Sequence, residues 1–263
     1  MEKEISEISK VRNADVDNSV YDTYGDRWYT ANDDPVALLR AESKTKTPWI
    51  LAQIEKYFPM DKSSQVLDVG CGGGFLSNAM ALEGLNVTGI DLSPESLRVA
   101  AKYDKTQSVS YKVADAYHLP FEDQSFHIVT AMDFLEHVDR PAEVIQEISR
   151  VLKPNGLFIF HTFNRNPIAH LVVIKLVEWL VKNTPRNLHV IKLFIKPSEL
   201  TQYCRQADLV VENMIGIKPV VSSIGLSPLF SGVVPNTLRF ELTSSLLISY
   251  MGISMKKSFR GQD

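Results

Sequence analysis

Residues 65–91 contain the feature that most limits how this chain can fold. Their sequence, QVLDVGCGGGFLSNAMALEGLNVTGID, predicts a strand, a tight glycine turn, a helix and a second strand. The apolar run VLDV leads directly into GCGGG, where the backbone must turn sharply and leaves room for a ligand. Residues 75–82 have helical spacing, Gly84 ends the helix, and Asp91 closes the second strand. This order predicts a nucleotide-binding βαβ unit, in which a carboxylate such as Asp91 accepts hydrogen bonds from two ribose hydroxyls.

The glycine spacing indicates which nucleoside cofactor the unit binds. A dinucleotide fingerprint, G-x-G-x-x-G, needs a third glycine where this chain has Phe75, which weakens the NAD interpretation. The observed spacing, Asp68-x-Gly70-x-Gly72-x-Gly74, resembles the first motif of the class I S-adenosylmethionine-dependent methyltransferases. This cofactor has no pyrophosphate, so the loop need only accept its aminoacyl end, while an acid helps to hold the ammonium and favours the sulfonium. We therefore expect S-adenosylmethionine to bind here.

Composition narrows the class of protein further. At 263 residues, with 44% hydrophobic and 22% charged residues, the chain suits one α/β domain with insertions. A net charge of -3 gives no basic field, so nucleic acid is a poor candidate substrate and a small molecule is favoured. The two cysteines, Cys71 and Cys204, have no paired spacing, and the charged start MEKEISEISK is unlike a secretory signal. With no run of 18 apolar residues to span a bilayer, we expect a cytoplasmic protein.

The rest of the chain continues a doubly wound pattern. Strands are predicted at 109–113, 126–132, 157–162, 209–215 and 246–253, in addition to the two around the glycine turn. We expect a Rossmann-like class I methyltransferase fold, with a seven-stranded, mostly parallel sheet, helices on both faces and an antiparallel last strand. Residues 1–60 are expected to form a helical or lid segment that includes a helix over 36–58, interrupted near Pro48. Residues 61–263 then form the methyltransferase domain, with a helical insertion at about 167–193 and an apolar loop at about 218–236.

Polar residues follow the third and fourth strands, where an open α/β sheet binds its ligand. Asp115 and Ala116 come after the third strand, where a carboxylate can meet the adenine amino group. Asp133, Glu136 and His137 come after the fourth strand, and they are placed where chemistry is expected.

Four pieces of sequence are similar to the ubiquinone-biosynthesis O-methyltransferases, which methylate phenolic hydroxyls of polyprenylated catechols. They are VLDVGCGGG at 66–74, LEHV at 135–138, NRN at 164–166, and FIKP at 194–197 preceded by His189. The resemblance covers roughly residues 64–215. It implies an O-methyltransferase for a phenolic or quinol small molecule of the polyprenylated, ubiquinone type. It also implies a basic residue in the cofactor pocket, for which Arg40, Lys44 and Lys46 are the candidates.

These arguments give a set of expected site residues. The predicted cofactor-binding residues are Asp68, Gly70, Cys71, Gly72, Gly74, Asp91, Leu92, Asp115, Ala116, Met132 and Lys46. A phenol with a pKa of about 10 is mostly protonated at neutral pH, so a base or a metal that favours the phenolate would help. Asp133, Glu136 and His137 are predicted to ligate Mg²⁺, a site that the family resemblance implies. The predicted bases are Glu136 and His137, with His161 and His189 as second choices. The structural alternative is that Glu136 caps a turn and His137 contacts the cofactor or bonds to backbone.

Two questions stay open in the sequence. The segment 168–181, IAHLVVIKLVEWLV, is too short to span a membrane but suits a helix in the bilayer interface, with Trp179 at headgroup depth and Lys175 and Lys182 on the polar side. The alternative is a buried pocket wall or a homodimer contact. A natural-product N-, C- or O-methyltransferase with a water-soluble acceptor is the second function. A non-catalytic cofactor-binding subunit is disfavoured by the intact glycine loop and Asp91.

Overall fold

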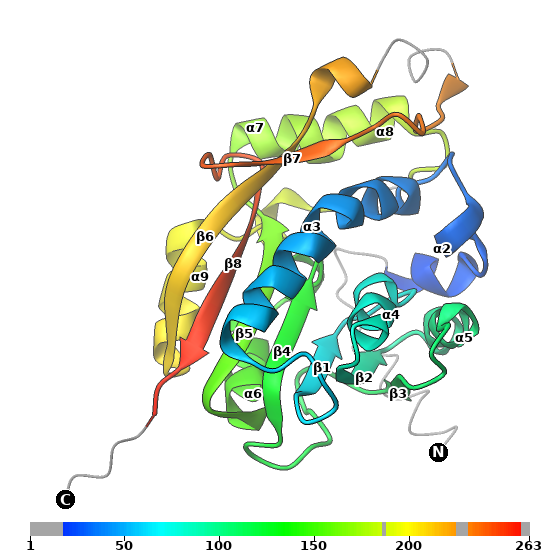
Figure 1. Ribbon diagram of the computed structural model, residues 1–263. Helices are drawn as coiled ribbons and strands as arrows, with labels where there is room; N and C mark the ends of the chain where they lie inside the picture. Colours follow the sequence, from blue (N-terminus) through cyan, green and yellow to red (C-terminus); the bar gives the residue numbers. More distant parts are fainter. Residues whose placement is uncertain (1–17, 186–187, 225–230, 259–263) are drawn as a thin grey trace, which may run out of the picture.

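The computed structural model describes residues 18–185, 188–224 and 231–258, and these surround one eight-stranded sheet (Figure 1). The strand order is β3-β2-β1-β4-β5-β8-β6-β7. The strands are β1 (Gln65–Val69), β2 (Asn86–Asp91), β3 (Ser110–Val113), β4 (Phe126–Met132), β5 (Leu152–Phe163), β6 (Leu209–Pro219), β7 (Phe240–Thr243) and β8 (Ser249–Lys256). Strands β1 to β5 pair in parallel, and β8 is antiparallel to both β5 and β6. The doubly wound fold predicted from the sequence is confirmed.

The predicted count of seven strands is wrong by one. Strand β7 pairs antiparallel with the end of β6 over four positions, from Gly216↔Thr243 to Pro219↔Phe240. It is a four-residue edge strand, FELT, in which Glu241 and Leu242 are exposed. A segment this short carries too little alternation to be told from a loop by its sequence. Part of the predicted apolar loop, residues 225–230, lies outside the described residues.

Helices cover both faces of the sheet (Figure 1). One face carries α3 (Val36–Tyr57), α4 (Phe75–Leu82) and α5 (Pro94–Tyr103), and the other carries α6 (Pro141–Val151) and α9 (Pro197–Gln206). On the first face Ile50 and Ile54 of α3 pack with Met80 of α4. On the second face Ile148 of α6 and Leu200 of α9 share a buried cluster with strand residues. Both faces of the parallel strands are therefore withdrawn from water, as their continuous apolar runs require.

Helix α3 runs without a break through Pro48, so the predicted interruption is wrong. A proline inside a helix removes one backbone hydrogen bond and crowds the preceding turn. Here the ring is exposed, while Ile50 and Ile54 in the following turns are almost completely buried against the sheet. Burial of these two side chains, each contributing about 1.5–3 kcal/mol, offsets the local cost of the proline.

Several short segments lie over the carboxyl ends of the strands. They are η1 (Asn18–Thr23), α2 (Arg27–Thr30), η2 (Leu135–His137), α7 (Pro167–Ala169), η3 (His170–Leu176), α8 (Val177–Leu180), η4 (Ile191–Leu193) and η5 (Val221–Ser223). Segments α7, η3 and α8 form one continuous insertion helix with a π-helical middle, which crosses the top of the molecule beside β7 (Figure 1). This is the apolar helix predicted at 168–181. Within the described ranges, no helix combines the length and apolarity needed to cross a bilayer.

Candidate active site

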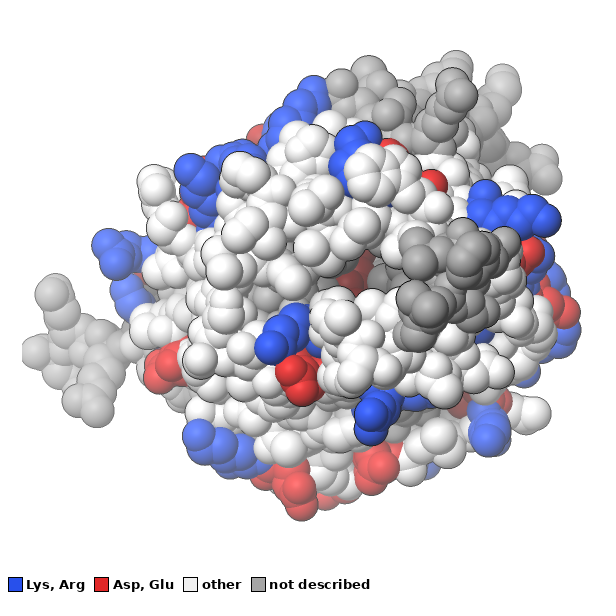
Figure 2. All heavy atoms as spheres, turned by 90° about the horizontal axis from the view of Figure 1, so that it is seen from above, with Lys and Arg blue, Asp and Glu red and all other residues white. Residues whose placement is uncertain are grey.

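A cavity of about 440 Å³ opens at the carboxyl ends of β1, β2 and β4. Its walls come from the glycine loop, the ends of these strands, helix α3 and the N-terminal segment η1. Figure 2 views the molecule from the side on which these strands end, and it shows a hollow with acidic atoms inside and mostly uncharged atoms around it. The site therefore lies where the sequence analysis expects a ligand.

The glycine loop forms one wall of this cavity. Gly70, Cys71 and Gly72 line it. Gly72 has a φ of +50°, and a Cβ added there would lie 2.8 Å from Cη2 of Trp28, so only glycine fits under that ring. Gly74 does not line the cavity: it begins α4 with a φ of +79°. Gly74 thus has a role in the turn itself, and its contact with the cofactor stays a prediction.

Asp91 lies at the end of β2 and lines the cavity. Its two carboxylate oxygens accept hydrogen bonds from the backbone N–H groups of Gly72 and Ser93, each at 2.9 Å. Burial raises the pKa of this carboxyl, and the two N–H groups oppose that rise. Each carboxylate oxygen can accept a second hydrogen bond. Asp91 is thus held in place by the loop and still has acceptor capacity for two hydroxyls.

Asp68 lines the same cavity from the end of β1, but it is almost completely buried. It accepts hydrogen bonds from Oγ of Ser77 at 2.6 Å and from Oγ1 of Thr130 at 2.7 Å. Burial raises its pKa to about 6, against the effect of the two hydroxyls. These bonds connect the loop to α4 and β4. A cation bound in the cavity would favour the ionised form of Asp68.

The residues predicted after β2, β3 and β4 divide into two groups. Leu92, Ala116 and Met132 line the cavity. Asp115 does not, and one of its oxygens instead accepts a hydrogen bond from the backbone N–H of Tyr117 at 2.9 Å. The predicted contact between Asp115 and adenine is therefore not supported, because this carboxylate closes its own turn while its neighbours face the cavity.

Lys46 reaches the cavity from α3 and is buried. Its ammonium pairs with Asp133 and, at 3.3 Å, with Glu42. Burial lowers the pKa of Lys46, but the two carboxylates more than compensate and raise it above its usual value. Sequence reasoning identified Lys46 and missed Glu42. The signal was present, because Glu42 and Lys46 are four residues apart and so share one face of the helix.

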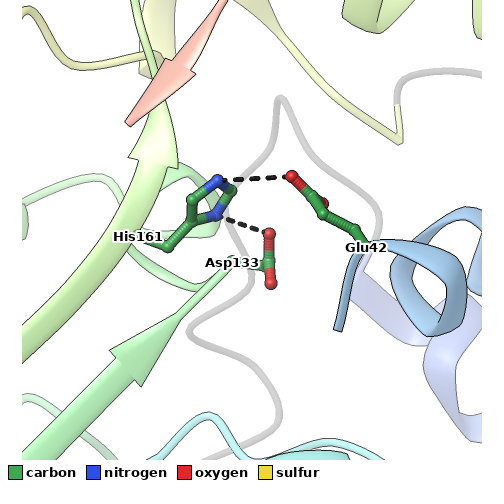
Figure 3. Close-up of side chains that lie close together, drawn as sticks. All are labelled: Glu42, Asp133 and His161. Atoms are coloured by element: carbon green, nitrogen blue, oxygen red, sulfur yellow. Dashed lines mark ion pairs between the residues drawn. The ribbon is translucent and has the colours of Figure 1, made fainter. Parts of the chain in front are cut away.

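Glu42, Asp133 and His161 converge (Figure 3). Lys46 pairs with the two carboxylates of this group. Nδ1 of His161 lies 2.7 Å from Oδ1 of Asp133, and its Nε2 lies 3.6 Å from Oε1 of Glu42. His161 is fully buried and lines neither this cavity nor the one described below. Both ring nitrogens of His161 face carboxylates, so the structure gives no support for direct contact with an acceptor, and the role of His161 as a base stays a prediction.

Asp133 is held in an unusual backbone conformation. Its φ is +53°, a left-handed value that non-glycine residues rarely adopt. Burial would raise the pKa of Asp133, but Lys46 and His161 outweigh burial and hold it well below its usual range. Such strain persists only where the surroundings enforce it, and it concentrates at functional sites. The carboxylate is therefore ionised and fixed at the meeting point of the cavity walls.

The predicted Mg²⁺ ligands are only partly assembled. Oε1 of Glu136 and Nδ1 of His137 are buried without a hydrogen-bond partner, whereas Oδ1 of Asp133 lies 2.7 Å from Nδ1 of His161. Carboxylate and imidazole atoms are chemically suitable ligands. However, Oε2 of Glu136 accepts a hydrogen bond from Thr162 at 2.8 Å. Among the described residues, the ligand atoms within 4.8 Å of one another belong to Glu42, Asp133 and His161. The convergent set shares only Asp133 with the prediction, and Lys46 already supplies its cation.

A second cavity, of about 190 Å³, adjoins the first. His137 lines both, and His189 lines the second, with their ring centroids 5.3 Å apart. Burial lowers the pKa of His137 to about 4 and that of His189 to about 3, and His137 lowers the latter further. Both imidazoles are therefore neutral at pH 7. A neutral imidazole can accept a hydrogen bond from the hydroxyl of a bound acceptor, and its lowered pKa makes it a weak base.

Two aromatic residues of the N-terminal segment, for which the sequence leaves open a helix packed on the domain edge or a lid over the active site, line the site. Tyr21 lines both cavities, and Trp28 lines the first and covers the glycine loop. Their rings stack at 5.8 Å. Asn18 adds a hydrogen bond from its side chain to the backbone carbonyl of His137, at 3.2 Å. The cluster of tyrosines and tryptophan in an otherwise polar segment was the available signal.

Comparison with known proteins gives a consistent result. A model of the methyltransferase domain matches residues 67–160. Curated proteins named ubiquinone biosynthesis O-methyltransferase, from Pseudomonas putida, Pseudomonas syringae pv. tomato and Pseudomonas fluorescens, are each 40% identical over 190 residues, which cover 71% of this chain and 76% of theirs. Among solved structures, a SAM-dependent methyltransferase from Methanosarcina mazei is 22% identical with a TM-score of 0.54, covering 78% of this chain and 97% of the other. The magnesium protoporphyrin IX methyltransferase of Synechocystis, solved with SAH, is 15% identical with a TM-score of 0.56, and the match covers 81% of this chain and 82% of that protein. These two structures bear on the fold alone.

Proposed function

Because this chain belongs to the ubiquinone biosynthesis O-methyltransferases, and is therefore an S-adenosylmethionine-dependent methyltransferase, we propose that it methylates a phenolic oxygen of a ubiquinone-type quinol or catechol. One observation carries this proposal from the family to the site. A cavity with two acidic residues at strand ends adjoins an apolar cavity lined by neutral imidazoles. The first suits a cationic nucleoside, and the junction of the two cavities, which His137 lines, suits an uncharged aromatic ring.

The first cavity is proposed to hold S-adenosylmethionine, which supplies an electrophilic methyl group on a sulfonium. Asp91 would accept hydrogen bonds from the ribose hydroxyls with the lone pairs that Gly72 and Ser93 leave free. Asp68 would favour the nearby positive charge, and Leu92, Ala116 and Met132 would contact the adenosine. Lys46 would face the aminoacyl end while remaining paired with Asp133 and Glu42.

His137 is proposed to accept the proton of the phenolic hydroxyl, with His189 as the second candidate. The oxygen forms a bond to the methyl carbon as the carbon–sulfur bond breaks, and the electron pair of that bond stays on sulfur. The hydroxyl proton becomes acidic as the new bond forms and passes to His137 in the same step, since a pKa of about 4 makes this imidazole too weak a base to remove it beforehand. Alignment of the two reacting atoms supplies most of the rate of such a displacement. Tyr21 and Trp28 would help to exclude water, since both cover the site.

We further propose that the site binds Mg²⁺. Asp133, Glu136 and His137 would hold the ion, because Asp133 is ionised and Glu136 and His137 each keep one buried ligand atom without a hydrogen-bond partner. Bound there, it would favour the phenolate form of the acceptor. Since the three side chains do not converge as they lie, Glu136 and His137 would have to turn toward Asp133. The proton transfer to His137 does not depend on this ion.

We also propose peripheral membrane contact through the insertion helix. Its outer side exposes Ile168, Leu171 and Trp179, with 49%, 49% and 69% of their surfaces accessible. An aromatic and aliphatic face of this kind suits the bilayer interface, where a polyprenylated acceptor resides. The cytoplasmic location and a homodimer remain predictions from the sequence.

The test is mass spectrometry of products after incubation with methyl-labelled S-adenosylmethionine and a panel of acceptors. The panel contains catechols and quinols, and water-soluble amines and carbon acids as competitors. Label on a phenolic oxygen is expected. Label confined to nitrogen or carbon acceptors would favour the natural-product methyltransferase instead. The Asp91→Ala protein serves as the control for cofactor-dependent labelling.

A further inference from the structure

We propose that the second cavity is a binding site for an aliphatic chain attached to the acceptor ring, so that the enzyme recognises ring and chain together. This inference rests on the proposed function, which supplies the phenolic ring. It goes further by assigning the chain to the protein interior, at least over its first segment.

The distribution of polar groups around this cavity indicates an amphiphilic occupant. Ionisable side chains gather where the cavity meets the cofactor site, and they are Glu42, Asp133, His137 and His189. Most of the remaining lining is aliphatic or aromatic, with valines, leucines, isoleucines and prolines from four parts of the chain. A ligand with a hydroxylated ring at one end and a hydrocarbon at the other matches this division.

The insertion helix forms one wall of the cavity with its inner side. Val173 and Val177 line the cavity, as does Val181 directly after the helix, while Leu171 and Trp179 on the same helix are exposed to solvent. The helix thus has two separate apolar sides, one toward solvent and one toward the cavity. A helix that only lies on lipid needs one apolar side. This helix also lines a cavity, which explains why it is apolar nearly all round.

The opposite wall comes from α3 and from the segment before β7. Leu38 and Leu39 of α3 line the cavity together with Val234 and Leu238. Val181, Val234 and Leu238 are buried in one cluster with Ala37, and Leu38 packs against it. The chamber is therefore closed by packed elements on both sides, as a binding site for a hydrocarbon requires.

The two cavities meet at shared residues. Tyr21, Leu39, Asp133 and His137 line both. An acceptor hydroxyl directed at the cofactor therefore lies next to these residues, and a ring substituent on the other side points into the chamber. A volume of about 190 Å³ is sufficient for a short hydrocarbon segment, because an apolar cavity of about 150 Å³ stays dry and binds benzene.

The experiment measures kcat/KM for catechols that carry no chain or chains of one, two and three isoprene units, in buffer without lipid or detergent. We expect kcat/KM to rise at least about ten-fold with the first unit, since each buried methylene favours binding, and to level off once the chamber is filled. The absence of lipid separates the chamber from the membrane as the source of the effect.

Two variants and a matched control locate the effect. Val177→Trp fills the chamber from the insertion helix, and Leu38→Phe narrows it from α3. Both should reduce the preference for prenylated over unsubstituted catechol to within about three-fold while turnover of unsubstituted catechol persists. Trp179→Val lies on the exposed side of the same helix and should retain the wild-type preference. Thermal unfolding of each variant identifies any that fails to fold, and Leu38→Phe is the milder change.

The outcomes separate this inference from the function on which it rests. Methylation of all catechols with equal kcat/KM would overturn the chamber and leave the O-methyltransferase assignment intact. A chain effect that appears only when vesicles are added would also overturn it. Equal losses in Val177→Trp and Trp179→Val would show that the cavity is not the determinant. Absence of any phenolic product would instead refute the proposed function.

Discussion

Asp91 and Asp68 are both buried carboxylates at strand ends, yet they differ in what their hydrogen bonds leave free. Asp91 is held by two backbone N–H groups and borders the cavity with unused lone pairs. Asp68 is engaged by two side-chain hydroxyls from α4 and β4. Asp91 is therefore suited to bind hydroxyls of the cofactor. Asp68 is suited to hold the glycine loop in place and to favour a positive charge in the cavity.

Asp91→Ala should weaken binding of S-adenosylmethionine roughly ten- to hundred-fold, because the ribose hydroxyls lose a charged acceptor. Isothermal calorimetry measures this directly. Asp115→Ala is the matched control, since Asp115 also follows a strand end but does not line the cavity. Equal losses in the two variants would contradict the assignment of the ribose to Asp91.

Asp68→Asn should change how stability depends on pH. Burial raises the pKa of Asp68 from 3.8 to about 6, so the folded protein binds more protons than the unfolded chain between these values. The wild type therefore loses stability as pH rises from about 4 to 6, by on the order of 3 kcal/mol, and the variant lacks this loss. Urea unfolding at pH 4 to 8 gives both curves. A difference in unfolding free energy that is constant across this range would contradict the prediction.

Chelation tests whether individual side chains after β4 hold a metal ion. If Mg²⁺ binds Asp133, Glu136 and His137, treatment with EDTA should lower turnover of a catechol at least ten-fold, and added Mg²⁺ should restore it. Activity that persists after exhaustive chelation would leave Lys46 as the cation of this cluster and His137 as the base.

A site residue can be predicted from the sequence when it belongs to a local motif, and it cannot when only the packing of distant segments brings it to the site. Asp68, Gly72 and Asp91 lie in one local motif with fixed spacing, so their places were predictable. Glu42 and Tyr21 come from segments far away in sequence, and only packing of α3 and η1 on the strand ends brings them to the cavity. His161 shows the reverse case, since its position at a strand end was right and its burial between two carboxylates was not predictable.

Among the elements, prediction succeeded where a strong periodic pattern coincides with clear ends. Helix α4 and strand β4 have the predicted bounds, because glycine turns and polar residues delimit them. Helix α3 was predicted with a break, since the effect of burying Ile50 and Ile54 cannot be seen next to a proline in one sequence. Strand β7 exists through its pairing with β6, which local sequence does not encode.

The insertion helix carries the membrane prediction. Leu171→Ser and Trp179→Ser should each reduce co-sedimentation with anionic vesicles about ten-fold, because each removes apolar surface that would enter the interface. Leu82→Ser is the control, since Leu82 is 58% exposed but lies at the end of α4. The membrane contact would be refuted if wild-type protein stayed in the supernatant, or if all three variants behaved alike.

At the scale of the whole molecule, the N-terminal segment closes over the cofactor loop. Trp28 is 5% exposed and packs on the glycine backbone at residues 72 and 73 and, with ring centroids 5.7 Å apart, on Phe75. The segment acts as a cover only if these contacts stabilise the bound cofactor.

Trp28→Ala should therefore raise the KM for S-adenosylmethionine about ten-fold, by opening the cavity to water and loosening the loop. Stopped-flow measurement of cofactor release should show a faster rate, while Trp28→Phe retains most of the aromatic surface and should stay close to wild type. An unchanged release rate in the alanine variant would show that residues 18–30 contribute packing alone.

The strand order has a further consequence for how this protein could acquire a new acceptor. Strands β1, β2 and β4 supply the cofactor residues, whereas Ile217 of β6, Phe240 of β7 and the insertion helix enclose the chamber. If the proposed sites are correct, the two substrates are recognised by opposite halves of one sheet, which meet at β4 and β5. Exchange of the insertion helix and of residues 217–240 for those of a relative should transfer acceptor preference and leave cofactor affinity unchanged. One continuous sheet would thus carry two substrate sites that can be changed independently.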